Sequence, residues 1–220
     1  MKRSFDLIGS IREHLAEAGF RQLPLKKEAS ALFFKPASGL FLTLGVEVSR
    51  RYRETFTGSF YLAPTFSWAY APPNEFPLKG YRRIGECLTP SQRKQVEPDA
   101  TAQQTDVWWH GFTPENAEQF AHFVTIAESK FLNTKGLVQS VKKSTAMREL
   151  LEQIAAVQQT YRQKTVANSP LVEKVRKEKT VPAKWYAAAA KVASERFQDY
   201  DHKDGIKMLA EESWLLSEFG

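Results

Sequence analysis

The stretch LFLTLGVEV at residues 40–48 alternates well and constrains the fold more than any other part of the chain. One face of this stretch is wholly aliphatic and consists of Leu40, Leu42, Leu44, Val46 and Val48. Thr43, Gly45 and Glu47 lie on the opposite face. This period of two predicts a strand with one face in the core. Residues 31–36 and 57–68 are further candidate strands, and PASG at 36–39 is a turn sequence, so an antiparallel meander is expected. Pro64 places the third strand at an edge or ends it.

Amphipathic helices are predicted on either side of these strands. Residues 4–19 place apolar side chains at steps of three and four, with Ser4 as a cap and Gly19 as the terminating residue. We expect this helix to pack on the apolar face of the meander. Shorter signals predict a strand over 81–88, a helix over 90–96 and a strand over 106–112. Thr113-Pro114-Glu115 then opens a helix that ends between Asn133 and Gly136.

The sequence after residue 136 contains only helical patterns. Helices are predicted over 144–164, over a basic stretch after Pro170, after Val181-Pro182, and after Asp204 as a cap. The expected fold class is therefore α+β, an antiparallel sheet with flanking helices followed by an all-helical C-terminal segment. The expected domains are residues 1–135 and 136–220.

The charge and the cysteine content indicate which partners and which cellular compartment to expect. The net charge is +6, of which +5 falls in residues 1–100, and this favours acidic partners. A single cysteine, Cys87, allows no intrachain disulfide. No apolar signal-peptide core and no apolar run of about 18 residues occurs, so a cytoplasmic protein without a membrane partner is expected.

Several short sequences resemble a loose group of bacterial domains of unknown function. These sequences are Gly19-Phe20 at the end of the first helix, LTLGVEVSR at 42–50, VWWHGF at 107–112 and the closing helix to Leu132. The resemblance covers about the first 130 residues. Some domains of this group resemble immunity proteins, which bind and neutralise a partner toxin. The resemblance thus implies a protein-binding role and transfers no active-site residues.

One group of basic and aromatic residues is a candidate binding site. Arginine forks bind phosphate or carboxylate, and aromatic faces stack on bases, so such a rim suits nucleic acid or an acidic protein. In the alternative interpretation, the arginines pair with Glu47, Glu54 and Glu86 and the aromatic side chains lie in the core. The candidate residues are Arg50, Arg51, Tyr52, Arg53, Trp68, Arg82, Arg83, Trp108 and Trp109.

Catalytic and metal-binding signals are weak by comparison. Arg82 and Arg83 could lower the pKa of Cys87, but a small buried hydrophobe on a strand is the favoured interpretation of that residue. His110 and His122 are too few for a zinc site, which needs three or four ligands. Residues 199–205 resemble a calcium loop, but the position of Gly205 differs from the required spacing by one residue. Phosphate-loop, dinucleotide and G-x-S-x-G motifs do not occur. No catalytic residue, metal or cofactor is predicted.

Three functions remain as hypotheses. The leading one is a non-enzymatic binding or accessory protein, of immunity type, whose protein partner is unidentified. The second is a nucleic-acid-binding protein that uses the rim around Arg50–Arg53. The third is an unrecognised hydrolase, which would need a perturbed Cys or His beside a carboxylate in a cleft.

Overall fold

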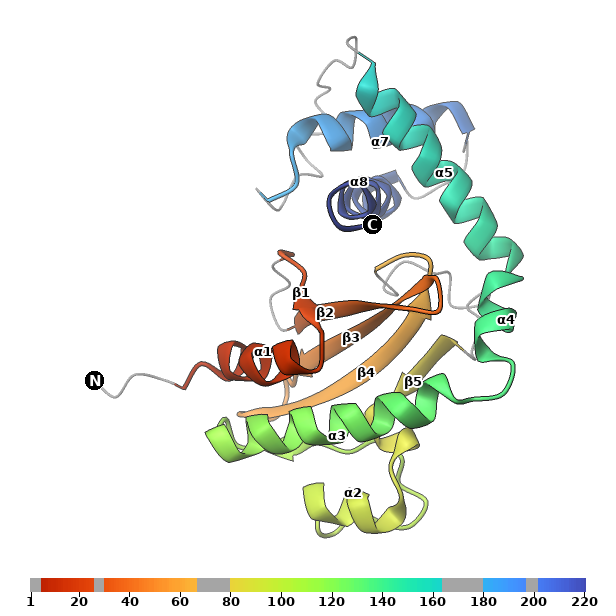
Figure 1. Cartoon of the computed structure of the whole chain (residues 1–220). Helices are drawn as coiled ribbons and strands as arrows, with labels where there is room; N and C mark the ends of the chain where they lie inside the picture. The colour runs from red at the N-terminus through yellow and green to blue at the C-terminus, as the bar shows by residue number, and fades with distance from the viewer. Residues whose placement is uncertain (1–4, 26–29, 67–79, 164–179, 197–201) are drawn as a thin grey trace. The chain divides into compact units, whose positions relative to one another are not determined.

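The computed structural model describes residues 5–25, 30–66, 80–163, 180–196 and 202–220 (Figure 1). The chain forms two compact units. The first consists of Met1–Ala63 and Pro77–Val141, and the second of Pro64–Phe76 and Lys142–Gly220. The C-terminal division thus falls after Val141, whereas the sequence suggested residue 135. Each unit is described by itself below.

A six-stranded antiparallel sheet is the centre of the first unit, which confirms the α+β class and the meander. The strands follow one another in the order β1-β2-β3-β4-β5, and β6 pairs with the start of β4. In the central pairs, Leu44 lies opposite Phe33 on β2 and opposite Phe60 on β4. The strands are β1 (Arg21–Gln22), β2 (Ser30–Ala37), β3 (Leu40–Val48), β4 (Thr55–Ala63), β5 (Tyr81–Arg83) and β6 (Trp109–His110).

Two helices, α1 (Leu7–Glu17) and α3 (Pro114–Leu132), pack against each other and on one face of this sheet (Figure 1). The aliphatic face of β3 contributes to the core that they cover. Helix α1 starts later than predicted, because Asp6 is its N-cap and accepts a hydrogen bond from the Gly9 N–H at 2.9 Å. The predicted cap, Ser4, lies outside the described residues.

The end of α1 follows the prediction. Gly19 has a φ of +81°, a conformation that glycine adopts without steric cost. The next N–H, that of Phe20, donates to the Leu15 carbonyl at 3.1 Å, and the Phe20 side chain is buried. This arrangement is a Schellman motif, and it turns the chain directly into β1, a strand that the sequence did not predict.

Several predicted strands are shorter in the structure. The strand expected over 81–88 ends at Arg83 and is followed by the 3₁₀ helix η2 (Ile84–Cys87), because the Glu86 carboxylate accepts from the Arg83 N–H. Cys87 therefore lies in a 3₁₀ helix and not on a strand. The strand expected over 106–112 is limited to β6. Strand β4 begins at Thr55 and ends at Ala63, immediately before Pro64.

Two short helices complete the first unit. Thr89 caps α2 (Pro90–Val96) and forms a capping box with Gln92, as the Thr-Pro sequence predicted. Thr113 caps α3 by accepting from the Asn116 N–H. The chain then passes Gly136, with φ +75°, into α4 (Leu137–Lys142), which was not predicted.

Three helices make up most of the described part of the second unit. Helices α5 (Thr145–Arg162), α7 (Ala183–Arg196) and α8 (His202–Phe219) pack against one another. The rings of Tyr161 on α5 and Trp185 on α7 stack at 3.8 Å between centroids. Asp204 was expected to cap the last helix, but α8 already begins at His202. The basic helix expected after Pro170 and residues 199–201 of the calcium-like stretch lie outside the described residues.

The second unit also includes a segment from the middle of the sequence. Chain segment 64–76 leaves the end of β4 and belongs to the helical unit by its contacts. In its described part, the Phe66 N–H donates to the Glu212 carboxylate of α8 at 3.0 Å, and both residues are buried. This hydrogen bond joins residues that are 146 positions apart in the sequence.

Candidate binding interface

The connection between β3 and β4, residues 49–54, is a hairpin loop that we call the arginine loop. Its backbone is fixed by the residues that flank it. The Ser49 hydroxyl accepts from the N–H groups of Arg51 and Tyr52 at 3.2 and 2.9 Å. Across the loop, the Thr55 hydroxyl donates to the Tyr52 carbonyl at 3.0 Å. Hydroxyl contacts of this kind hold a loop in one turn conformation.

A second set of contacts ties the base of the arginine loop to β6. The Gly111 N–H donates to the Glu54 carbonyl at 2.7 Å, and Thr55 lies opposite His110 in the sheet. Glu54 has a φ of +54°, which non-glycine residues rarely adopt and which neighbouring structure must maintain. The loop is therefore held from both of its ends.

The side chains of the arginine loop extend into solvent. Arg50, Arg51 and Arg53 are exposed, and Tyr52 is 60% exposed, a high value for a large ring. The Arg51 guanidinium lies 5.6 Å from the centroid of the Tyr52 ring. Within the described parts of the chain, none of the three arginines forms an ion pair. The loop thus presents three positive charges, one aromatic ring and the single carboxylate of Glu54.

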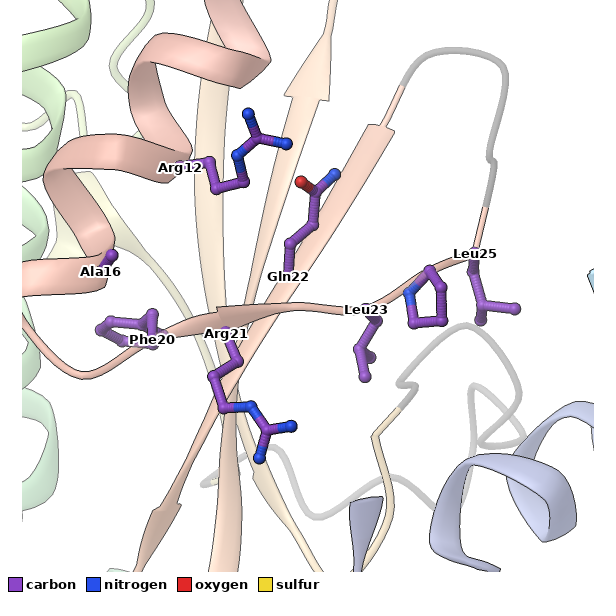
Figure 2. Close-up of a pocket in the computed structure, with 8 residues that line it drawn as sticks. Arg12, Ala16, Phe20, Arg21, Gln22, Leu23 and Leu25 are labelled. Atoms are coloured by element: carbon purple, nitrogen blue, oxygen red, sulfur yellow. The ribbon is translucent and has the colours of Figure 1, made fainter. Parts of the chain in front are cut away.

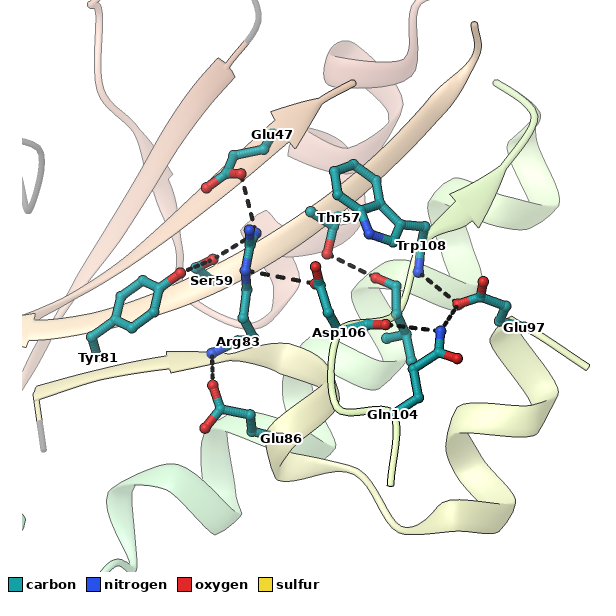
Figure 3. A network of polar contacts seen from close by, with 11 residues as sticks. Glu47, Thr57, Ser59, Tyr81, Arg83, Glu86, Glu97, Gln104, Asp106 and Trp108 are labelled. Carbon is teal, nitrogen blue, oxygen red and sulfur yellow. Dashed lines mark hydrogen bonds and ion pairs between the residues drawn. The ribbon is translucent and has the colours of Figure 1, made fainter. Parts of the chain in front are cut away.

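The other two arginines of the predicted rim, Arg82 and Arg83, have acidic partners within the first unit. Figure 3 shows the contacts of Arg83. Arg83 on β5 lies 3.1 Å from the Glu47 carboxylate, 3.4 Å from the Ser59 hydroxyl and 3.6 Å from Asp106. Partial burial opposes the charge of Arg83, but the negative charges of Glu47 and Asp106 outweigh it and raise the pKa. Arg82 lies 3.6 Å from Glu86. For these two residues, the interpretation as structural ion pairs is confirmed.

Further polar contacts of this network hold residues 104–108 across β4 (Figure 3). The Thr57 hydroxyl donates to the Val107 carbonyl at 2.8 Å. The Glu97 carboxylate accepts from the Gln104 amide at 2.9 Å and from the Trp108 N–H at 3.4 Å. These acceptors and donors satisfy one another, so the network has the character of a structural support.

The aromatic part of the predicted rim is not assembled. Trp109 is fully buried, stacks on Phe56 at 5.9 Å and contacts the edge of Phe120 at 4.9 Å. Its indole N–H donates to Gln119 at 3.0 Å. Trp108 is half-buried within the network above. Trp68 lies outside the described residues. Tyr52 is therefore the aromatic candidate that the described structure exposes.

Cys87 does not have the environment of a nucleophile. The residue is 5% exposed, and burial together with the charge of Glu86 raises the pKa of its thiol to about 11. A catalytic cysteine needs the opposite shift, because the thiolate is the reactive form. His110 lies near Glu97 at 4.0 Å, and His122 packs on Phe123. Among the described residues, no group of three His, Cys, Asp or Glu side chains could hold a metal ion.

Sequence reasoning found the arginines of the loop and missed the residues that fix them. Ser49 and Thr55 frame the segment RRYRE, and hydroxyl residues on both sides of a polar connection are a recognisable turn signal. The contribution of Gly111 had no such local signal, because β6 follows the loop by more than fifty residues.

In the described part of the chain, no helix combines the length and apolar character that crossing a membrane requires. No protein-family model, no curated protein and no solved structure matches the chain.

Proposed function

We propose that this chain is a non-enzymatic binding protein that recognises an acidic protein surface through the arginine loop. The observation that carries the proposal is the contrast among five arginines. Arg82 and Arg83 have acidic partners in the fold, whereas Arg50, Arg51 and Arg53 have none within the described residues and are exposed. An acidic partner would supply the missing carboxylates.

The composition and rigidity of the loop support protein recognition. Tyrosine and arginine are the residue types that most often dominate the binding energy of protein interfaces. A loop whose backbone is already hydrogen-bonded loses little conformational entropy on binding. The Ser49 and Thr55 contacts provide that order in advance. The resemblance to toxin-immunity domains agrees with a protein that acts by occupying a partner's surface.

Nucleic acid is the less favoured partner on the same observations. Binding of a single strand combines a long positive groove with several aromatic platforms. Here Trp109 is buried, and the guanidinium of Arg83 is neutralised by Glu47 and Asp106. Among the described aromatic candidates, only Tyr52 is mostly exposed. The compact loop therefore fits a small carboxylate patch better than an extended polyphosphate.

The experiment compares charge reversal in the loop with charge reversal elsewhere. The tagged chain captures partners from a lysate of its host, in parallel with Arg51→Glu/Arg53→Glu and a control, Lys142→Glu/Lys143→Glu. Both pairs are exposed, lack ion-pair partners among the described residues and change the net charge equally. We expect one protein at constant stoichiometry with the wild type and the control, and its loss with the loop variant.

Nuclease treatment and salt separate the alternatives. A captured protein that survives nuclease and has an acidic binding surface supports the proposal. Nucleic acid in the eluate, with an affinity that falls steeply as salt rises, would replace it with the nucleic-acid hypothesis. Capture of the same protein by the loop variant and the wild type would refute the role of the arginine loop.

A further inference from the structure

Strand β1 is the outer strand of the sheet, and none of the described strands pairs with its outer edge. The register shows which backbone groups that edge offers. The Leu23 N–H donates to the Leu32 carbonyl at 2.8 Å, so Leu23 and Leu32 form a hydrogen-bonded pair. In an antiparallel ladder such pairs alternate with pairs that are not hydrogen-bonded. The N–H and carbonyl of Gln22, opposite Phe33, therefore point outward, away from β2.

A cavity of about 590 Å³ lies at this edge (Figure 2). All its lining residues come from α1 and from the segment that follows it, within the first unit. Its volume falls within the range of roughly 300–1,000 Å³ that is typical of ligand sites. Apolar side chains provide most of the wall and arginines provide the charge. The lining residues are Arg12, Ala16, Phe20, Arg21, Gln22, Leu23, Pro24 and Leu25.

The side chains that line the cavity lie on two opposite sides of β1. In Figure 2, Arg12 of α1 and Gln22 lie on one side of the strand, and Arg21 and Leu23 extend to the other. Arg12 is exposed and has no ion-pair partner among the described residues. The Arg21 guanidinium lies 5.5 Å from the centroid of the Phe34 ring, which holds its charge beside the edge. No carboxylate lines the cavity.

We propose that this edge binds an extended acidic peptide segment, which adds to β1 as a short strand. Successive side chains of a strand point to opposite faces, as the two sets of cavity residues do. Acidic side chains of the segment would meet Arg12 on one face and Arg21 on the other, and an apolar one would contact the exposed Pro24. Gln22 would supply one backbone donor and one acceptor.

The same edge limits how far the added strand extends. Pro24 has no N–H and cannot donate to a neighbouring strand. Strand β1 itself contains two residues. Backbone pairing is therefore confined to the surroundings of Gln22, and the arginines and the cavity wall provide the selectivity for acidic sequences. This site is separate from the arginine loop and does not depend on the function proposed for that loop.

The test measures binding of a fluorescein-labelled peptide of alternating Glu and Val to the full chain by anisotropy. Arg12→Glu is expected to weaken binding by about tenfold or more, the effect of one charge-assisted contact. Gln22→Pro removes the outward N–H, whereas its control, Gln22→Ala, retains it. We expect Gln22→Pro to weaken binding and Gln22→Ala to leave it near the wild-type value, with both variants folded by circular dichroism.

Three outcomes would overturn the proposal. The first is equal binding of a Lys-Val peptide, the second equal affinity of Arg12→Glu and the wild type, and the third equal affinity of the two Gln22 variants. The loop variant Arg51→Glu/Arg53→Glu distinguishes the two sites. If it abolishes peptide binding while Arg12→Glu does not, the peptide binds at the arginine loop, which supports the proposed function and refutes the edge site.

Discussion

Substitution of Arg83 and of Arg51 by alanine should have opposite effects on stability and on binding. The two residues were equivalent members of one predicted rim, but only Arg83 is engaged by the fold. Arg83→Ala removes the guanidinium between Glu47, at 3.1 Å, and Asp106, at 3.6 Å. The Arg83 side chain is 26% exposed and that of Glu47 27%, so the variant leaves a largely covered carboxylate without its cation.

The magnitude follows from those two ion pairs. Ion pairs in exposed positions contribute about 0.2–1 kcal/mol each, and the coverage of Arg83 and Glu47 places their pair near the upper value. The Asp106 side chain is 46% exposed, so its pair contributes less. Loss of both pairs and of the packed alkyl stem predicts that Arg83→Ala lowers the free energy of unfolding by about 1–2 kcal/mol. Arg51→Ala removes an exposed side chain and should change it by less than about 0.5 kcal/mol.

Urea denaturation of the full chain, followed by tryptophan fluorescence, measures the first effect. Capture of the partner protein by the folded variants measures the second. We expect Arg83→Ala to lose stability and retain capture, and Arg51→Ala to retain stability and lose capture. Reduced capture by Arg83→Ala at unchanged stability would refute the separation of the two arginines and would restore the extended rim as the binding surface.

Four further predictions test the structural basis of the fold and the loop. Ser49→Ala should accelerate amide hydrogen exchange at Arg51 and Tyr52, at a stability cost of about 0.5–1 kcal/mol; unchanged exchange would show that the hydroxyl does not order the loop. Gly19→Ala should lower the free energy of unfolding by about 1 kcal/mol in urea titrations, because its φ is +81°. Trp109→Ala should cost about 3–5 kcal/mol by the same measurement, as expected of a core ring and not of a binding residue. The raised pKa of Cys87, about 11 against 9.0, means that its contribution to stability is complete below pH 9 and is lost as the pH rises towards 11; Cys87→Ala should reduce the fall of the urea midpoint across that interval.

Features with a local signal could be predicted from the sequence. The alternation of 40–48 specified β3 at both ends, and Gly19-Phe20 specified the end of α1. The caps Thr89 and Thr113 specified the starts of α2 and α3, because one hydroxyl and a following proline determine each start.

Features that depend on distant partners could not be predicted in the same way. Strands β1 and β6 contain two residues each, and only their pairing with β2 and β4 makes them strands. A local contact was also missed: within 81–88, residues 84–87 form a 3₁₀ helix because the Glu86 carboxylate accepts from the Arg83 N–H three residues earlier. Such contacts leave no periodic pattern in the sequence.

In the candidate site, too, the sequence identified the arginines but not which of them form ion pairs. In the sequence, Arg53 is followed directly by Glu54, and Arg83 is followed three residues later by Glu86. The sheet brings Glu47 to Arg83 across β4, whereas Glu54 adopts a positive φ at the end of the loop and forms no ion pair in the described structure. Which arginine is available to a partner therefore depends on how the strands pair in the sheet.

The segment that joins β4 to β5 governs how this chain can be divided. Because 64–76 belongs to the helical unit while 77–141 returns to the sheet unit, no single cut separates the two. A fragment ending at Val141 would retain Phe66 without Glu212, and a fragment starting at Lys142 would lack the strand-end segment that its last helix binds. During synthesis, all residues of the sheet unit are present once residue 141 has been added, whereas Phe66 can form its hydrogen bond with Glu212 only after the final helix has been made. Independent production of either unit would require a circular permutation or a linker in place of this segment.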